Sequence, residues 1–244
     1  MKYLIPSLGR SSKIGNIIDI LGKENTVVYV NNNEVDEYAK YISIKNIKGM
    51  PDNIKGIVYV RKYMYEDNIK ENYICQIDDD FGGMIYRHDG NDTFVTIKDK
   101  DHIYDIIGNA YQIAYDIGTP LFCFDGTHNP TFYSSMTMTK FSGTLPSFHG
   151  MIPSLMGDMN YDTRFTVMED HDLAFMCKFK KRYIFFDHRY SMRFHTPYFQ
   201  EGGCSTNRNT KILNDCGELL LKKYGSVCVK RDKNKLQYGI NFPY

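Results

Sequence analysis

Short apolar runs and helix-like segments alternate through the first third of the sequence, and this alternation constrains the fold more than any other feature. The expected strands are residues 2–6, 26–30, 42–44 and 73–77, and the expected helices are residues 11–22, 33–41 and a stretch near 63–71. Ser11 or Ser12 can cap the first helix, and Gly22 can end it. Strands that alternate with helices predict an α/β fold, with a mostly parallel, Rossmann-like sheet flanked by helices.

The remainder of the sequence predicts a different mixture of elements. They are a hairpin over residues 83–97 with its turn at 89–91, a helix over 99–118, strands at 121–125 and 183–195, a strand leading into a helix over 165–181, and a last helix from about residue 209. These strands predict a smaller mixed sheet in the second half. No internal repeat or Pro-rich linker divides the chain, so we expect one domain over residues 1–244.

The composition is that of an ordinary globular protein, with 42% hydrophobic and 24% charged residues. No apolar run approaches the roughly 18 residues of a membrane helix, and the apolar core of residues 1–10 is too short for a signal peptide. We therefore expect a cytoplasmic protein without a membrane segment. The 6 cysteines include no C-x-x-C pair, which predicts reduced and mostly buried thiols.

Basic residues are concentrated near the C-terminal end, although the net charge of the chain is only +1. Residues 222–235 contain six lysines and arginines against Asp232 alone, a net charge of about +5. Such a run is most often a solvated surface. The alternative is an edge that contacts phosphates, for example those of a nucleic acid.

Polar side chains follow three of the expected strands, where ligands bind in parallel sheets. Ser7, Gly9 and Arg10 follow the first strand, residues 31–33 are three asparagines after the second, and residues 78–80 are three aspartates after the fourth. Carboxylates in such a row repel one another unless a positive charge lies among them. A divalent cation such as Mg²⁺ or Mn²⁺ would supply it, whereas the alternative is a solvated loop or a helix cap.

A second acidic group, VMEDHDL, contains Glu169, Asp170 and Asp172 at the expected start of a helix. Acids are favoured there by the helix dipole, which is the purely structural explanation. A carboxylate at this edge could also accept a proton from a substrate hydroxyl, although a helix N-terminus lowers its pKa and weakens it as a base. Among the histidines, His188 and His195 are candidate metal ligands, and His149 is a candidate for lining a pocket.

In their order and spacing these segments resemble the GT-A nucleotide-sugar glycosyltransferases. QIDDDF matches the D-x-D motif of that family, VMEDHDL matches its x-E-D segment, and about ninety residues separate the two. More narrowly, YLIPSLGR followed by DDDF, the E-D helix and Gly202–Gly203 resembles the TET-associated glycosyltransferases. Many of these are encoded by bacteriophages and are thought to glycosylate hydroxymethylpyrimidines in DNA.

The resemblance implies a nucleotide-sugar-binding half over residues 1–98 and an acceptor and catalytic half over residues 99–244. It implies that a nucleotide sugar, expected to be UDP-linked, is bound by Pro6, Ser7, Arg10, Arg61 or Lys62, Asp78 and Asp79. It implies that Mn²⁺ or Mg²⁺ is held by Asp78, Asp80 and His195 (or His188), and that Asp170 or Glu169 acts on the acceptor hydroxyl.

Other functions fit parts of the same pattern. The acceptor could be a glycan or a small molecule rather than modified DNA. A nucleotidyltransferase of similar fold would need a glycine-rich first loop, which PSLGRSSKIG lacks. A non-catalytic nucleic-acid-binding protein would use the basic segment 222–235, and its binding would depend on salt but not on Mn²⁺ or UDP.

Overall fold

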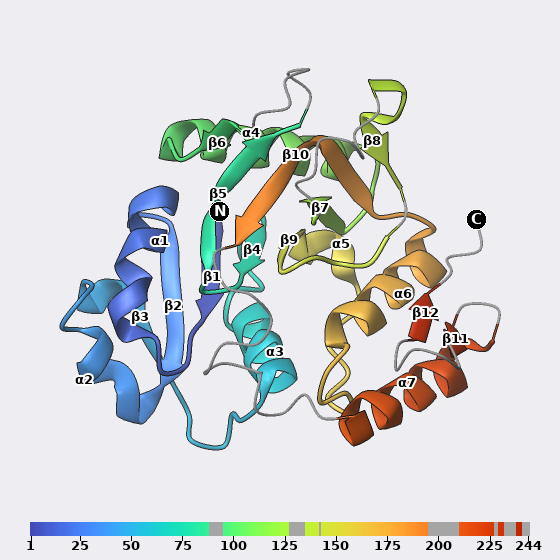
Figure 1. Cartoon of the computed structure of the whole chain (residues 1–244), viewed down its shortest axis with the longest axis horizontal. Coiled ribbons are helices and arrows are strands. Elements are labelled where there is room, and N and C mark those ends of the chain that lie inside the picture. Colours follow the sequence, from blue (N-terminus) through green and yellow to red (C-terminus); the bar gives the residue numbers. More distant parts are fainter. Residues whose placement is uncertain are drawn as a thin grey trace.

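A long mixed sheet runs through the molecule and includes strands from both halves of the chain (Figure 1). The computed structural model describes residues 1–87, 95–126, 135–141, 143–194, 210–226, 229–231 and 238–240. Its strands are β1 (Lys2–Pro6), β2 (Thr26–Asn31), β3 (Ile47–Met50), β4 (Ile74–Ile77), β5 (Phe81–Tyr86), β6 (Val95–Ile97), β7 (Leu121–Asp125), β8 (Thr139–Lys140), β9 (Phe148–Met151) and β10 (Phe185–Phe194). They lie in the order β3-β2-β1-β4-β9-β7-β10-β5-β6, and β8 pairs with β10.

The strands of the first third are parallel, as the alternation of strands and helices predicts. β1 pairs in parallel with both β2 and β4, and β2 pairs in parallel with β3. β9 is antiparallel to both β4 and β7, so β4 and β7 run in the same direction. The prediction of an α/β fold with a mostly parallel central sheet is confirmed, and the mixed strands of the second half continue the same sheet.

Helices cover both faces of this sheet and form two hydrophobic cores. The helices are α1 (Ile14–Leu21), α2 (Val35–Tyr38), α3 (Ile57–Asp67), α4 (Lys100–Asp116), α5 (Pro153–Met156), α6 (Glu169–Lys181) and α7 (Thr210–Tyr224). α1 and α4 pack on one face, around Phe122. α3 and α6 pack on the other, around Ile74 and Leu121. Because side chains alternate along a strand, residues of β4 that face α3 and α6 are two positions apart.

The C-terminal helix α7 lies beside α6 (Figure 1). Phe175 of α6 stacks on Tyr224 of α7 with ring centroids 4.7 Å apart, and Leu220 is fully buried in the third hydrophobic cluster. A two-stranded sheet of β11 (Val229–Arg231) and β12 (Tyr238–Ile240) follows α7. The helix expected from about residue 209 is therefore present, and it packs against the helix that carries the second acidic group.

Two elements of the first third lie a few residues from their expected positions. The third strand is β3, not residues 42–44, because Ser43 starts a 3-10 turn (Ile44–Asn46) by accepting a hydrogen bond from the Lys45 amide. The helix expected near 63–71 is α3, which begins after Gly56 at φ +91°. It ends before Asn68, whose side-chain amide donates to the Met64 carbonyl.

Three further predictions concern caps, strands and cysteines. The first helix is not capped by Ser11 or Ser12, since the chain there forms a 3-10 turn (Ser11–Lys13) before α1. Residues 165–168 precede α6 without forming a strand. The four cysteines that the structure describes are free and buried, as expected.

Across the described ranges, no helix is both long and apolar enough to cross a membrane.

Candidate active site

The three aspartates form the turn between β4 and β5, at the carboxyl end of β4. The Asp78 amide donates to the Ser147 carbonyl at 3.1 Å, and the Phe81 amide donates to the Asp78 carbonyl at 3.3 Å. These main-chain bonds fix the turn against the neighbouring loop before β9. All three aspartates are partly exposed, and each carboxylate has different surroundings. The turn therefore presents three carboxylates at one edge of the sheet.

Asp79 is held by the loop that follows β1. The Ser7 hydroxyl donates to Asp79 Oδ2 at 2.7 Å, and the Arg10 guanidinium forms an ion pair with Asp79 Oδ1. Tyr38, from α2, lies 2.7 Å from the Ser7 hydroxyl and accepts a hydrogen bond from the Arg10 amide. Pro6 ends β1 next to this loop. The structure thus brings together Ser7, Arg10 and Asp79, which were predicted to bind the nucleotide sugar.

Asp80 differs from its two neighbours because no side chain in the described part of the molecule forms a hydrogen bond or ion pair with it. Burial raises the pKa of Asp80 to about 6, and the negative charges of Asp78 and Asp79 add to the rise. A carboxylate in this situation is stabilised by a cation.

The residues described do not form a complete metal cage. Within the described ranges, no group of three His, Cys, Asp or Glu side chains lies close enough to hold a metal ion. Of the three carboxylates at the turn, Asp78 and Asp80 are the two predicted metal ligands. Mg²⁺ and Mn²⁺ prefer oxygen ligands, and Mg²⁺ usually keeps several water ligands and binds through one or two carboxylates and substrate phosphates. The turn therefore fits such an ion. Asp80, which has no side-chain partner among the described residues, is the strongest candidate ligand.

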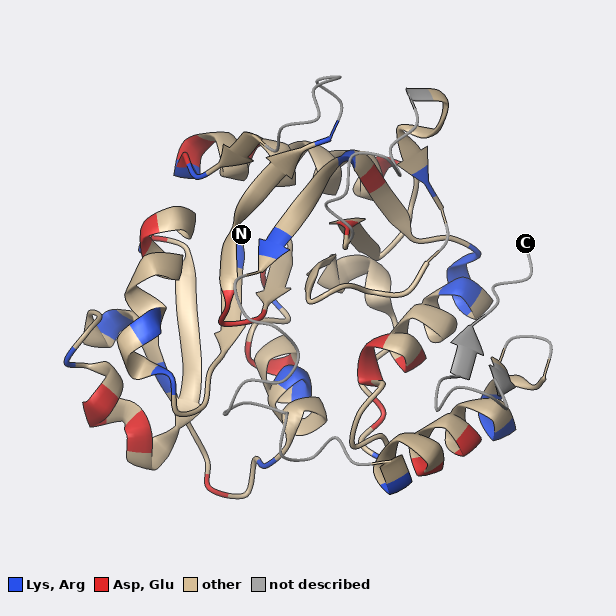
Figure 2. Ribbon diagram, viewed as in Figure 1, with Lys and Arg blue, Asp and Glu red and all other residues tan. Residues whose placement is uncertain are grey.

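The second acidic group opens α6, as predicted, and the helix carries basic residues at its other end (Figure 2). Asp170 Oδ1 accepts from both the main-chain amide and Nδ1 of His171, each at 2.8 Å. Burial alone would raise the pKa of Asp170, but His171 and Arg61 hold it well below its usual range. Glu169 has the opposite shift, because burial and the charge of Asp170 raise its pKa.

Arg61 of α3 connects the two acidic segments. Its Nη2 donates to Asp78 Oδ1 at 2.8 Å, and its Nε lies 3.1 Å from Glu169 Oε1. The second contact is an ion pair without hydrogen-bond geometry. The Arg61 side chain is only 6% exposed and that of Glu169 only 8% exposed. The predicted binding residue Arg61 is thus an interior counterion of both motifs, whereas the neighbouring Lys62 lies near Glu66 on the surface.

The predicted histidines have different locations. His195 lies outside the described residues. The strand that leads to it, β10, ends at Phe194, which pairs with Phe81 directly after Asp80. His188 lies apart from the aspartate turn, with Nδ1 3.6 Å from Asp125.

His149 is fully buried and therefore does not line an open pocket, contrary to its candidate role. It belongs to a polar group that the sequence analysis missed. The Tyr161 hydroxyl lies 2.8 Å from both His149 Nε2 and Gln76 Oε1, and Gln76 donates to the Arg61 carbonyl. Gln76 could have been noticed as the one polar residue in the apolar run YICQI.

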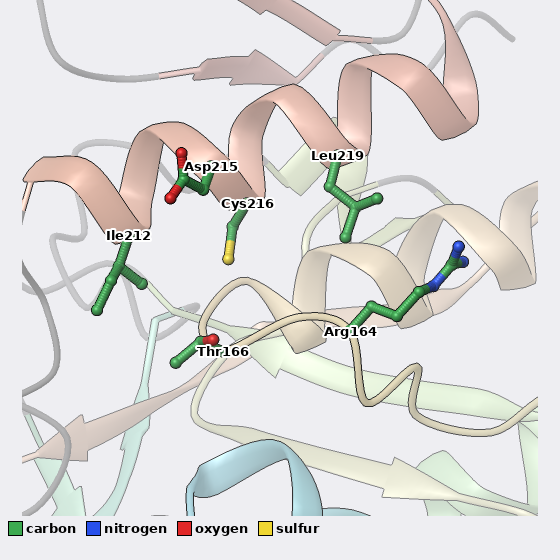
Figure 3. A pocket seen from close by; sticks show the side chains of 6 residues that line it. All are labelled: Arg164, Thr166, Ile212, Asp215, Cys216 and Leu219. Carbon is green, nitrogen blue, oxygen red and sulfur yellow. The ribbon is translucent and has the colours of Figure 1, made fainter.

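The basic segment 222–235 is described only in part. Lys222 and Lys223 are both exposed, but the Lys223 ammonium lies 2.7 Å from the buried Asp172 and 3.0 Å from Asp162. A pocket of about 110 Å³ lies between α7 and the loop before α6 (Figure 3). Its lining residues are Arg164, Thr166, Ile212, Asp215, Cys216 and Leu219. None of the predicted site residues lines this pocket.

Comparison with known proteins identifies the family. The family model of the TET-associated glycosyltransferases matches residues 1–203. The chain belongs to this family. No curated protein matches it. Membership confirms the predicted family and the enzyme class, a glycosyltransferase, and α7 lies beyond the matched residues.

One of the solved structures that match supports the fold. The crystal structure of S. aureus TarS superposes with a TM-score of 0.52 at 11% identity, covering 91% of this chain and 40% of TarS. The chain therefore spans less than half the length of that protein. A UDP-glucose pyrophosphorylase complexed with UDP-glucose matches at a TM-score of 0.43 and 10% identity, over 79% of this chain and 91% of the other.

Proposed function

We propose that this TET-associated glycosyltransferase moves a sugar from a UDP-sugar to a hydroxyl acceptor at the edge of the sheet where β4 ends. The observation that carries this assignment is the pairing of Arg61 with both Asp78 and Glu169. It joins a carboxylate turn suited to a metal and a diphosphate to a second acidic group suited to proton transfer. A nucleic-acid-binding protein would need neither group.

In this mechanism the loop after β1 and the aspartate turn bind the donor. Ser7 and Arg10, both held against Asp79, form the wall beside the nucleotide, with Pro6 at its base. Asp78 and Asp80 would hold Mn²⁺ or Mg²⁺, with His195 as the further ligand that the resemblance implies. Such an ion supplies Lewis-acid stabilisation of the charge on the departing diphosphate.

Asp170 is the carboxylate that an acceptor can reach, and we propose that it takes the acceptor proton although its lowered pKa makes it a weaker base than Glu169. The Asp170 side chain is 30% exposed, and His171 is bonded to Oδ1, which leaves Oδ2 for the acceptor. In an inverting reaction the acceptor oxygen forms the bond to the anomeric carbon, the bond to the diphosphate breaks, and the proton passes to Asp170. Glu169, buried against Arg61, instead holds the guanidinium in place.

The acceptor that we propose is a hydroxymethylpyrimidine in DNA. This choice rests on the family, and Lys222, which is exposed at the end of α7, is one residue of the basic segment that could meet a phosphate. A glycan or small-molecule acceptor would use the same donor site. We place the reaction in the cytoplasm, or in the host cytoplasm if a phage encodes the chain.

The experiment is a thermal-shift panel of UDP, GDP and UDP-sugars, each with and without MnCl₂. We expect stabilisation by UDP and one of its sugars only when Mn²⁺ is present. Stabilisation by GDP but not UDP would show that the donor nucleotide carries guanine rather than the uracil that we propose. Stabilisation by no nucleotide would contradict the transferase assignment. Transfer of label from the stabilising donor to hydroxymethylcytosine DNA, compared with unmodified DNA, then tests the acceptor.

A further inference from the structure

A buried polar group lies directly beneath the aspartate turn. Gln76 lies in β4 and Asp78 directly follows that strand, and both side chains bond to Arg61 of α3, so they lie on the same side of the sheet. Gln76 pairs across the strands with His149 of β9, and both side chains are fully buried. Tyr161, only 2% exposed, places its hydroxyl 2.8 Å from Gln76 Oε1 and 2.8 Å from His149 Nε2. Three polar side chains thus meet inside the core that α3 and α6 cover.

The protons of this group can be counted. His149 Nδ1 lies 3.1 Å from the Pro146 carbonyl, which can only accept, so Nδ1 carries a proton. Burial and the charge of Arg61 lower the pKa of His149 to about 3, so the ring is neutral and Nε2 is an acceptor. Tyr161 therefore has one hydroxyl proton for two acceptors, His149 Nε2 and Gln76 Oε1. The group lacks one donor.

Arg61 lies beside this group and carries an unused donor. Its Nη1 is buried and has no hydrogen-bond partner in the described part of the chain. The charge of the guanidinium and a side-chain hydrogen bond from Arg61 lower the pKa of the Tyr161 hydroxyl, against the rise that burial causes. The Gln76 side-chain amide donates to the Arg61 carbonyl at 3.0 Å, so the same group also holds the main chain of α3. Polar groups that are buried together are stable when donors and acceptors match.

We propose that Tyr161, together with Gln76 and His149, is a positioning residue for sugar transfer, because it holds Arg61 where the guanidinium contacts both Asp78 and Glu169. The expected effect on catalysis rests on the proposed function. The inference assigns a role to a buried tyrosine outside both acidic motifs. The position of Arg61 that it predicts can be measured without any substrate.

The test compares Tyr161→Phe with Tyr29→Phe. Tyr29 is also buried in the second core, and its hydroxyl bonds to two side chains, Asp67 and Asn68, each at 2.7 Å. Both variants therefore lose one buried hydroxyl with two partners. With UDP-glucose and MnCl₂ as the probe, we expect Tyr161→Phe to lower kcat for UDP release about tenfold to a hundredfold, with KM nearly unchanged. Tyr29→Phe should keep the wild-type kcat.

A measurement by ¹⁵N NMR separates this inference from the proposed function. The Arg61 side-chain NH signals should move in Tyr161→Phe and stay in place in Tyr29→Phe, and His149 should show the Nδ1–H tautomer in the wild type. Arg61 signals unchanged by Tyr161→Phe would overturn the inference, as would an unchanged kcat. If the wild type neither binds UDP with Mn²⁺ nor releases UDP, the proposed function fails. The NMR comparison still decides whether Tyr161 holds Arg61 in place.

Discussion

Nε of Arg61 lies 3.1 Å from Oε1 of Glu169, and this contact joins two acidic segments that are about ninety residues apart in the sequence. Both side chains are almost completely buried. The same guanidinium also donates to Asp78. One cation in the interior thereby sets the relative position of the turn after β4 and the start of α6.

Replacing Arg61 by Met should destabilise the protein strongly. The substitution leaves the buried Glu169 without its positive partner, and loss of one member of a buried ion pair costs about 3–5 kcal/mol. Urea unfolding would measure this loss in the absence of metal. Lys62→Met, one residue along α3 and on the surface, should change the free energy of unfolding by less than about 0.5 kcal/mol. Equal stability of the two variants would contradict the role of Arg61 as an interior counterion.

Asp80→Asn should make the metal-free protein more stable at pH 8. Burial and the charges of Asp78 and Asp79 raise the pKa of Asp80 from 3.8 to about 6. The folded protein therefore binds a proton that the unfolded chain releases earlier, so this group lowers stability as the pH rises from about 4 to 6. The expected gain is about 1–2 kcal/mol, reduced because the group is partly exposed.

Urea unfolding in EDTA at pH 8 and at pH 4 checks this sign, since the gain should nearly disappear at pH 4. Asp158→Asn is the matched control, because Asp158 is exposed and already paired with Lys180. It should give no gain at either pH. A lower stability of Asp80→Asn at pH 8 would contradict the claim that the metal-free turn destabilises the ionised carboxylate of Asp80.

Lys223→Met should loosen the attachment of α7 to α6. Lys223 lies 2.7 Å from Asp172, which is 1% exposed, and Tyr224 donates to the same carboxylate oxygen. Without the lysine, the buried carboxylate keeps only one side-chain partner, which costs about 1–3 kcal/mol. Lys222→Met removes the neighbouring exposed charge and should leave stability within about 0.5 kcal/mol. The two variants would be compared by urea unfolding, and the same loss in both would contradict the role of Lys223 as the partner of the buried Asp172.

The sequence predicts the edge of the sheet better than it predicts the contacts there. Ser7 and Asp79 meet because parallel strands place their carboxyl ends together, and this follows from the order of strands and helices alone. Arg61 was predicted to meet the base or the phosphates. Its partners in the structure are Asp78, directly after β4, and Glu169, at the start of α6, and no pattern within α3 indicates which distant carboxylates it meets.

The displaced elements have local causes that are weak in the sequence. β3 contains Gly49, which packs so closely on Asn32 that an added Cβ would lie 2.7 Å from Asn32 Oδ1, and a glycine is a residue that a strand pattern does not favour. The competing run ISI (42–44) is more β-like, but Ser43 turns the chain there. Tyr161 lies in a segment without regular structure, so its role depended entirely on the folded positions of Gln76 and His149.

The most direct test of the account is calorimetric titration of UDP into the wild type, Asp80→Asn and Asp158→Asn, each with MnCl₂ and with EDTA. If the aspartate turn is a metal and diphosphate site, the wild type and Asp158→Asn should bind UDP only with Mn²⁺. Asp80→Asn should then lose most of that binding, tenfold or more in Kd by an order-of-magnitude estimate for a lost metal ligand. UDP binding by Asp80→Asn equal to that of the wild type, or wild-type binding that is indifferent to Mn²⁺, would contradict the account.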